Sequence, residues 1–442
     1  MAPLNIFLTT WNTGLQGSKA QSQDLTSWLL PVLHDPELPA AIPDIYAVAV
    51  QELLPVHLAL AGLSKTVLAV LTDRIQSLLS SHATSLSEDK TPESYILVGR
   101  VSHVGNALWI FARESTLGGR LGKPLTATLG LWWLGMGNKG AVGLRLPVRR
   151  GEKEGGWETL TFVCTHLEAY DQQIPRRNAQ YQTILSSLIF RSSDPLAQPA
   201  NIRDTSHLFL MGDLNYRLLR LPSTGLPSEG KAADDILALE KERAELIDLD
   251  TLRREQREGR VFGGLREGDL SRFAPTYKRI VGQIEGYSRK RIPGYTDRIL
   301  FASHTDPDHL FSPQSTISPT PPPIPESTTQ ITHFSSTPSI TVSDHKPVHA
   351  IIQLPGVSHS ARAPHLAPTL ASPPSPHPPV PEPTPLLELT LWKLLGTILD
   401  RTVGWPWCIL VLLGYGNPTA GMGVSAFVAM VFGVWWSGVW SA

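Results

Sequence analysis

The sequence is poor in cysteine, with only Cys164 and Cys408 in 442 residues. Two cysteines cannot form the disulfide framework of a small secreted protein, so we expect a reducing compartment for the main part of the chain. Cys164 lies within the apolar run 160–164 and lacks the surroundings of a cysteine phosphatase loop. We therefore predict that Cys164 is a buried small residue and not a nucleophile.

An excess of charge of either sign is also missing, because the formal net charge is −1. No overall field attracts nucleic acid or anionic lipid, so any anion site must be local, and we expect no nucleic-acid partner. The N-terminus lacks a basic region followed by an apolar segment. A secretory signal peptide is therefore not expected.

The C-terminal part lacks charge altogether, since no charged residue follows Arg401. Residues 409–413 and 426–434 are strongly apolar, and six of the twelve tryptophans lie in the last 51 residues. This pattern predicts a membrane anchor over 389–442, as one transmembrane span or, given the break at 414–418, a hairpin. The alternative is an apolar element packed on the globular domain. Lys393 and Arg401 before the apolar tail favour a cytoplasmic globular domain, with the endoplasmic reticulum as the expected membrane.

Proline marks two further segments. The stretch 312–327 cannot form a helix or an interior strand, so we predict a surface insertion. The stretch 355–385 is richer still in proline and is expected to be a semi-extended linker. The predicted organisation is a catalytic domain at 1–355, a linker at 356–388 and the anchor at 389–442.

Within the first 355 residues, apolar runs of strand length alternate with segments of helical spacing, which predicts an α/β domain. The expected strands are 6–11, 45–50, 95–101, 107–112, 125–133, 141–146, 160–165, 207–211, 299–301, 331–342 and 347–354. The expected helices are 23–33, 56–79, 181–189 and a charged segment within 234–258.

Polar residues follow the ends of several of these apolar runs. The run 207–211 ends at Gly212, where the backbone is free to turn, and Asp213 and Asn215 then point to one face of an extended chain. Taken alone, this pair could equally be a turn that caps a core strand. The same pattern recurs at Asn12, Glu52, His166, Asp297 with Arg298, and Asp344 with His345. Strand ends in a layered β-structure can converge on one rim, where carboxylate and amide oxygens suit Mg²⁺ and hydrolytic attack on phosphorus.

Cations and hydrogen-bond donors stand in short motifs around these positions. They include Lys139, Arg177 with Asn178, and Tyr277 with Lys278. Lysine offers a point charge and arginine a planar fork for phosphate oxygens. The alternative for any one of them is an ordinary solvated surface charge.

These motifs together resemble those of the inositol polyphosphate 5-phosphatases. The matching segments are 10–14, 51–52, 137–142, 165–167 with 177–178, 212–217, 275–278, 296–300 and 343–348, in that family's order across about residues 4–354. The resemblance implies a four-layer α/β/β/α sandwich of the deoxyribonuclease-like kind. The segment 293–296 departs from the family pattern because it lacks a cysteine, which affects packing more than chemistry.

The resemblance also implies roles for the catalytic residues. Glu52, assisted by Asn12, would hold Mg²⁺, and Asp344 would be an outer metal ligand. Asp213 would orient or deprotonate the attacking water, Asn215 would fix that water or a phosphate oxygen, and His166 would stabilise charge in the transition state. His345, paired with Asp297, would bind the phosphate. Whether Asp213 or the His345–Asp297 pair is the general base stays open.

For the substrate, the resemblance implies that Tyr277, Lys278 and Arg298 bind the 4-phosphate of the ring. Lys139, Arg177 and Asn178 would lie near other phosphates. The expected function is Mg²⁺-dependent hydrolysis of the 5-phosphate of phosphatidylinositol 4,5-bisphosphate at a membrane, together with other phosphoinositides or soluble inositol polyphosphates. The alternatives are a neutral sphingomyelinase-like or nuclease-like phosphodiesterase, and a non-catalytic, membrane-anchored lipid-binding scaffold.

Overall fold

The computed structural model describes residues 3–19, 24, 26–38, 41–87, 90–150, 156–194, 196–219, 246–288, 291–306, 328–356 and 381–440. The predicted insertion at 312–327 and most of the predicted linker lie outside these residues, as does the first part of the charged segment 234–258.

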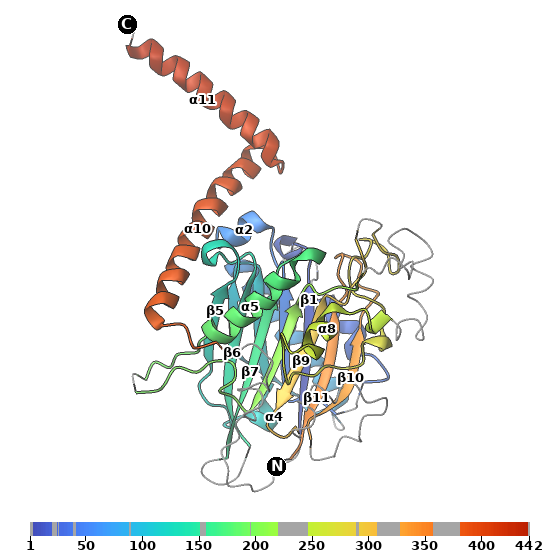
Figure 1. Ribbon diagram of the computed structural model, residues 1–442. Coiled ribbons are helices and arrows are strands. Elements are labelled where there is room, and N and C mark those ends of the chain that lie inside the picture. Colours follow the sequence, from blue (N-terminus) through green and yellow to red (C-terminus); the bar gives the residue numbers. More distant parts are fainter. Residues whose placement is uncertain are drawn as a thin grey trace.

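Two mixed sheets form the centre of the molecule (Figure 1). In spatial order the first contains β10 (Gln330–Ser336), β11 (Val348–Leu354), β1 (Leu4–Asn12), β2 (Ile45–Gln51), β4 (Asn106–Arg113) and β3 (Tyr95–His103). The second contains β5 (Leu125–Gly130), β6 (Gly140–Arg149), β7 (Trp157–His166), β8 (His207–Asp213) and β9 (Asp297–Ser303). Each sheet has one parallel pair, β1 with β2 and β7 with β8, among antiparallel neighbours.

Helices cover the outer faces of the two sheets. Within the described residues the α-helices of the domain are α1 (Leu30–Leu33), α2 (Val56–Leu60), α3 (Lys65–Leu86), α4 (Glu114–Leu117), α5 (Ile174–Ser187) and α8 (Thr251–Arg257). Helices α10 (Leu386–Leu413) and α11 (Pro418–Trp440) follow at the C-terminal end and do not cover a sheet. One apolar core lies between the sheets, a second joins the first sheet to α1 and α3, and a third joins the second sheet to α5 and α8. Three cores between four layers confirm the predicted α/β/β/α sandwich.

The core between the sheets follows from the period-2 alternation of the strands. Phe162 and Phe209 point inward from β7 and β8, and their rings stack with centroids 5.0 Å apart. Cys164 lies in the same core, where burial raises the pKa of its thiol to about 12. The thiolate is therefore inaccessible at neutral pH, in agreement with the prediction that Cys164 is not a nucleophile.

Helix boundaries agree less well with the sequence patterns. Within the expected helix 23–33, the described residues form a short 3₁₀ turn, Ser27–Leu29, followed by α1. The expected helix 56–79 is interrupted between α2 and α3, where Gly62 adopts a φ of +75° that ends the first helix. Such a left-handed conformation is characteristic of glycine at helix C-termini.

The C-terminal helix α10 packs against the catalytic domain through one narrow stripe. Its buried residues include Gly396, Asp400 and Gly404, which are four positions apart and so share a helix face. A Cβ at Gly396 would lie 2.1 Å from the carbonyl oxygen of Gly135, and one at Gly404 would lie 2.3 Å from the Ala61 nitrogen. The helix therefore fits closely beside α2 and the 3₁₀ turn Trp133–Gly135, and Figure 1 shows α11 extending beyond the domain.

None of the helices within the described residues is long and apolar enough to cross a membrane. The transmembrane part of the anchor prediction is thus not supported. The alternative, an apolar element packed on the globular domain, describes α10.

Candidate active site

The strand register brings the predicted catalytic residues together at one end of the sandwich. Asp213 at the end of β8 lies opposite His166 on β7 and opposite Asp297 on β9. Asn12 and Gln51 end the parallel pair β1 and β2 in the facing sheet, and Glu52 follows directly. Residues more than 280 positions apart in the sequence (12 and 297) therefore line one site.

Asp213 lies at the centre of this cluster and is buried. Its Oδ2 accepts a hydrogen bond of 3.0 Å from Asn12 Nδ2 and lies 3.3 Å from His166 Nε2 and 3.9 Å from His345 Nε2. Burial alone would raise the pKa of Asp213, but the charge of His345 and the hydrogen bond from His166 outweigh it and hold the pKa well below its usual range. Asp213 is therefore a carboxylate at neutral pH.

His345 and Asp297 form a buried ion pair beside it. His345 Nδ1 donates to Asp297 Oδ2 at 2.9 Å, and the hydroxyl groups of Thr276 and Thr296 donate to the same oxygen at 2.6 Å and 3.0 Å. Burial lowers the pKa of His345, but Asp297 and Asp213 oppose this effect more strongly and raise it to about 9. The imidazole is thus protonated at neutral pH, which suits a phosphate-binding cation and not a general base. The choice between Asp213 and this pair as the general base stays a prediction.

Glu52 provides a carboxylate suited to a divalent cation. Its Oε1 lies 4.0 Å from His166 Nε2, and about a third of its side chain is exposed. Among the residues that the structure describes, no group donates a hydrogen bond to this carboxylate, and Glu52 itself has a φ of +50°. A partly exposed carboxylate beside the Asn12 amide and Asp213 is an oxygen donor set that fits Mg²⁺.

Lys139 and His166 lie on the other side of Asp213. The Lys139 ammonium contacts His166 Nε2, and burial lowers the pKa of Lys139 although Asp213 and Glu52 favour its charged form. The loop before Lys139 is held by the C-terminal helix, because both Asp400 carboxylate oxygens lie 3.2 Å from the Gly137 nitrogen. Helix α10 therefore supports a loop of the candidate active site.

Tyr277 and Lys278 border the cluster. The Tyr277 ring packs over the His345 imidazole, with centroids 4.6 Å apart. The Lys278 ammonium forms an ion pair with Asp344, and both side chains are partly exposed. Asp344 is therefore engaged by Lys278, and its role as an outer metal ligand stays a prediction.

Three residues predicted to bind substrate lie apart from the cluster and are already paired. Arg298 is fully buried, where its guanidinium forms ion pairs with Asp250 at 3.0 Å and with Glu267. Arg177 donates to the backbone carbonyls of Glu168 and Tyr170 at 3.0 Å and 2.7 Å. The role expected for Arg298 needs correction, because two buried acids hold its guanidinium and leave no donor fork for a phosphate. Arg177 is bonded through Nη1 alone, so its expected place near a phosphate stays a prediction.

Asn178 is likewise engaged away from the site. It donates to Glu255 at 2.7 Å and accepts a hydrogen bond of 2.7 Å from the Tyr216 hydroxyl. Asn178 thus connects α5 with Glu255 in α8 and with Tyr216 after β8, and its expected place near a phosphate stays a prediction.

Arg217 is a site residue that the sequence reasoning missed. Its Nη2 donates to Asn215 Oδ1 at 3.1 Å, and its guanidinium lies 4.8 Å from the centre of the Tyr277 ring. Asn215 has a φ of +58° and donates to the Leu167 carbonyl at 3.1 Å, so its amide is held from both ends. The sequence could have indicated a site role for Arg217 through its position two residues after Asn215 in the same motif.

Comparisons with known proteins place this site in context. The model of the Endonuclease/Exonuclease/phosphatase family 2 matches residues 9–351. The "Type IV inositol polyphosphate 5-phosphatase 3" of Arabidopsis thaliana is 31% identical over 49% of this chain and 31% of its own length. The "Type IV inositol polyphosphate 5-phosphatase 9" of the same plant is 27% identical over 78% of this chain and 76% of its own.

A solved structure gives the same fold. The inositol polyphosphate 5-phosphatase domain of SPsynaptojanin, in complex with inositol (1,4)-bisphosphate and a calcium ion, has a TM-score of 0.57 and 22% identity, over 80% of this chain and 84% of that one. The chain spans less than two thirds of the length of the first curated relatives, 31% and 64% for the first two. The resemblance seen in the motifs is confirmed by these relatives. Because the family model matches most of its length, the chain belongs to the Endonuclease/Exonuclease/phosphatase family 2.

Proposed function

We propose that this protein is a Mg²⁺-dependent phosphatase that removes the 5-phosphate from phosphorylated inositol, with phosphatidylinositol 4,5-bisphosphate as the lipid substrate. The observation that carries the proposal is the position of Asp213. Its ionised carboxylate lies between Asn12, His166 and the His345–Asp297 ion pair, with the Glu52 carboxylate beside His166. The named 5-phosphatases among the relatives support the choice of phosphate.

In the proposed mechanism Asp213 orients the attacking water and accepts its proton. The charged His345 binds a phosphoryl oxygen, and Asp297 keeps that imidazole protonated and oriented. His166 and Lys139 stabilise the negative charge that grows on the phosphoryl group in the transition state. Mg²⁺, held by Glu52 with Asn12, would polarise the phosphoryl oxygen.

The ring specificity is proposed to come from Lys278 and Tyr277. Lys278 is partly exposed beside the cluster, and its present partner Asp344 is partly exposed as well, so a ring phosphate can replace or share this contact. The Tyr277 face is packed between His345 and the Arg217 guanidinium, which fixes the position of the following residue, Lys278. A phosphate adjacent to the scissile one would bind there, and neither sphingomyelin nor DNA carries such a group.

A lipid substrate is supported by exposed apolar side chains near the site. Trp133 lies on the loop that leads to Lys139, and Val281 and Ile284 follow the Tyr277–Lys278 segment; all three are more than half exposed. Helices α10 and α11 expose further large apolar side chains. We propose that these surfaces contact the cytoplasmic face of an internal membrane, such as the endoplasmic reticulum, which cell fractionation with and without residues 414–442 would test.

The function is tested by phosphate release from phosphatidylinositol 4,5-bisphosphate, soluble inositol trisphosphate, sphingomyelin and DNA, each with Mg²⁺ and with chelator. We expect Mg²⁺-dependent release from the first two and no cleavage of the others. Asp213→Asn is the matched control, because it keeps the shape of the side chain and removes the base. Cleavage of sphingomyelin or DNA would favour the phosphodiesterase alternatives, and binding without turnover would favour a lipid-binding scaffold.

A further inference from the structure

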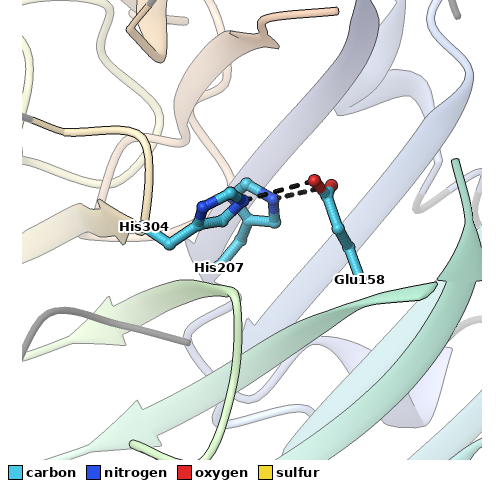
Figure 2. Close-up of side chains that lie close together, drawn as sticks. All are labelled: Glu158, His207 and His304. Carbon is cyan, nitrogen blue, oxygen red and sulfur yellow. Dashed lines mark hydrogen bonds and ion pairs between the residues drawn. The ribbon is translucent and has the colours of Figure 1, made fainter. Parts of the chain in front are cut away.

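A second cluster of metal-ligating side chains lies at the opposite end of the second sheet. It consists of Glu158, His207 and His304, and we refer to it as the distal cluster (Figure 2). Glu158 is near the start of β7, His207 begins β8, and His304 follows β9 directly. Since β8 runs from His207 to Asp213, six strand residues, or about 20 Å, separate the distal cluster from the candidate active site.

The distal cluster already has nearly the spacing of a metal site. Glu158 Oε2 lies 3.0 Å from His207 Nε2, and Glu158 Oε1 lies 3.2 Å from His304 Nε2. Ligands of a tetrahedral zinc ion are about 3.3 Å apart, because each lies about 2.0–2.1 Å from the metal. Figure 2 shows both imidazole rings directed at the same carboxylate. An ion could therefore be bound with small side-chain movements.

The surroundings of His207 are those of a metal-binding imidazole. Its second ring nitrogen, Nδ1, lies 2.9 Å from the Ser303 hydroxyl, which in turn lies 2.8 Å from the Thr305 hydroxyl. A metal-bound histidine normally donates its other N–H to such an acceptor, which fixes the ring. His207 is fully buried, whereas His304 is about one-fifth exposed, so a water could occupy a fourth position from that side.

One neighbour opposes an ion. The buried Arg150 guanidinium donates to Glu158 Oε2 at 2.9 Å and to the Pro355 carbonyl at 2.7 Å. The guanidinium charge repels a cation and makes the Glu158 carboxylate a weaker metal ligand. Arg150 should therefore weaken metal binding. It should not prevent binding, because the other carboxylate oxygen, Glu158 Oε1, is turned toward His304.

We propose that the distal cluster is a second, structural metal site, selective for zinc-class divalent ions. Two imidazole nitrogens and one carboxylate favour Zn²⁺ over Mg²⁺, which prefers oxygen ligands. The ion would join β7, β8 and the turn after β9 at the end of the sandwich opposite the candidate active site. This site is independent of the proposed phosphatase activity, because none of its residues contacts the active-site cluster.

The test is zinc binding by the full, chelator-treated protein in excess Mg²⁺, measured by calorimetry and by the thermal unfolding midpoint. We expect one Zn²⁺ per chain and a higher midpoint. His304→Ala should weaken binding at least tenfold and abolish the rise in midpoint, while phosphate release stays unchanged. His34→Ala, which replaces an exposed histidine elsewhere, is the control and should bind normally.

Arg150→Gln gives a second, opposite readout. Without the guanidinium we expect the metal-free protein to be less stable and zinc binding to be tighter. If the distal cluster is held by hydrogen bonds alone and binds no ion, zinc should stabilise none of the variants. Absence of zinc binding in the wild type overturns the proposal. So does zinc bound with equal affinity by His304→Ala, since the ion would then lie elsewhere.

Discussion

Replacing Asp297 by asparagine should convert the charged His345 into a neutral imidazole at neutral pH. Asp297 holds His345 by a 2.9 Å hydrogen bond and is, after the opposing effect of burial, the strongest influence on the pKa of His345. A rise from 6.5 to about 9 corresponds to about 3 kcal/mol between the two protonation states. Because burial remains in Asp297→Asn, the pKa of His345 should fall by about 2 or more.

Two measurements follow from this pKa. Since the folded-state value is raised, the stabilisation by the ion pair is complete below pH 6.5 and is lost as the pH rises through about 9. The free energy of unfolding of the wild type should therefore decrease between these values, and that of Asp297→Asn should not. The alkaline limb of kcat/KM against pH should lie near pH 9 in the wild type and shift below neutrality in the variant.

Thr276→Val is the control for this prediction. It removes a 2.6 Å hydrogen bond to the same Asp297 oxygen but leaves the carboxylate charge in place. It should therefore move the alkaline limb far less than Asp297→Asn does. If both variants retain the wild-type limb, His345 is not the group that titrates there and the assigned role of the ion pair is incorrect.

Further predictions concern the base, the ring contact, the tail helix and the metal. Asp213→Asn should lower kcat by about 10²–10⁴-fold, and near-normal turnover would remove Asp213 as the base. Lys278→Ala should reduce kcat/KM for a 4,5-bisphosphate more than for a 5-monophosphate; equal losses would exclude Lys278 from recognising the 4-phosphate. Burial raises the pKa of Asp400 from 3.8 to about 6. The free energy of unfolding should therefore fall as the pH rises between these two values, because the unfolded chain loses the Asp400 proton first. Asp400→Asn should lack this decrease when unfolding is measured against pH. Chelation of Mg²⁺ should abolish phosphate release, and adding Mg²⁺ back should restore it.

The strands and their polar ends could be predicted from the sequence because both depend on local patterns. Apolar runs of strand length identified most of the strands. Glu52 and Asp213 stand at the ends of such runs, so their positions at strand ends could be predicted together with the strands. Motif order then placed these ends at one rim, which the register of β7, β8 and β9 confirms.

The arginines show where such reasoning fails. Arg298 and Asp297 are adjacent in the sequence, yet successive strand residues point to opposite faces, and Arg298 meets Asp250 and Glu267 there. Nothing local to Arg298 indicates those distant partners. The bonds of Arg177 could not be predicted either, because its partners are backbone carbonyls of the loop before α5, which no side-chain pattern records.

The close fit of α10 has a consequence for how the enzyme would approach a lipid surface. Gly396 and Gly404 leave no space for the helix to turn about its own axis or slide along the domain. The apolar side chains on its outer side, such as Leu391, Ile398 and Trp405, therefore point in one fixed direction relative to the Lys139 loop. A bilayer touching that side would meet the catalytic domain in a single pose, so the distance from headgroup to Asp213 would be set by rigid geometry and not by the length of a tether.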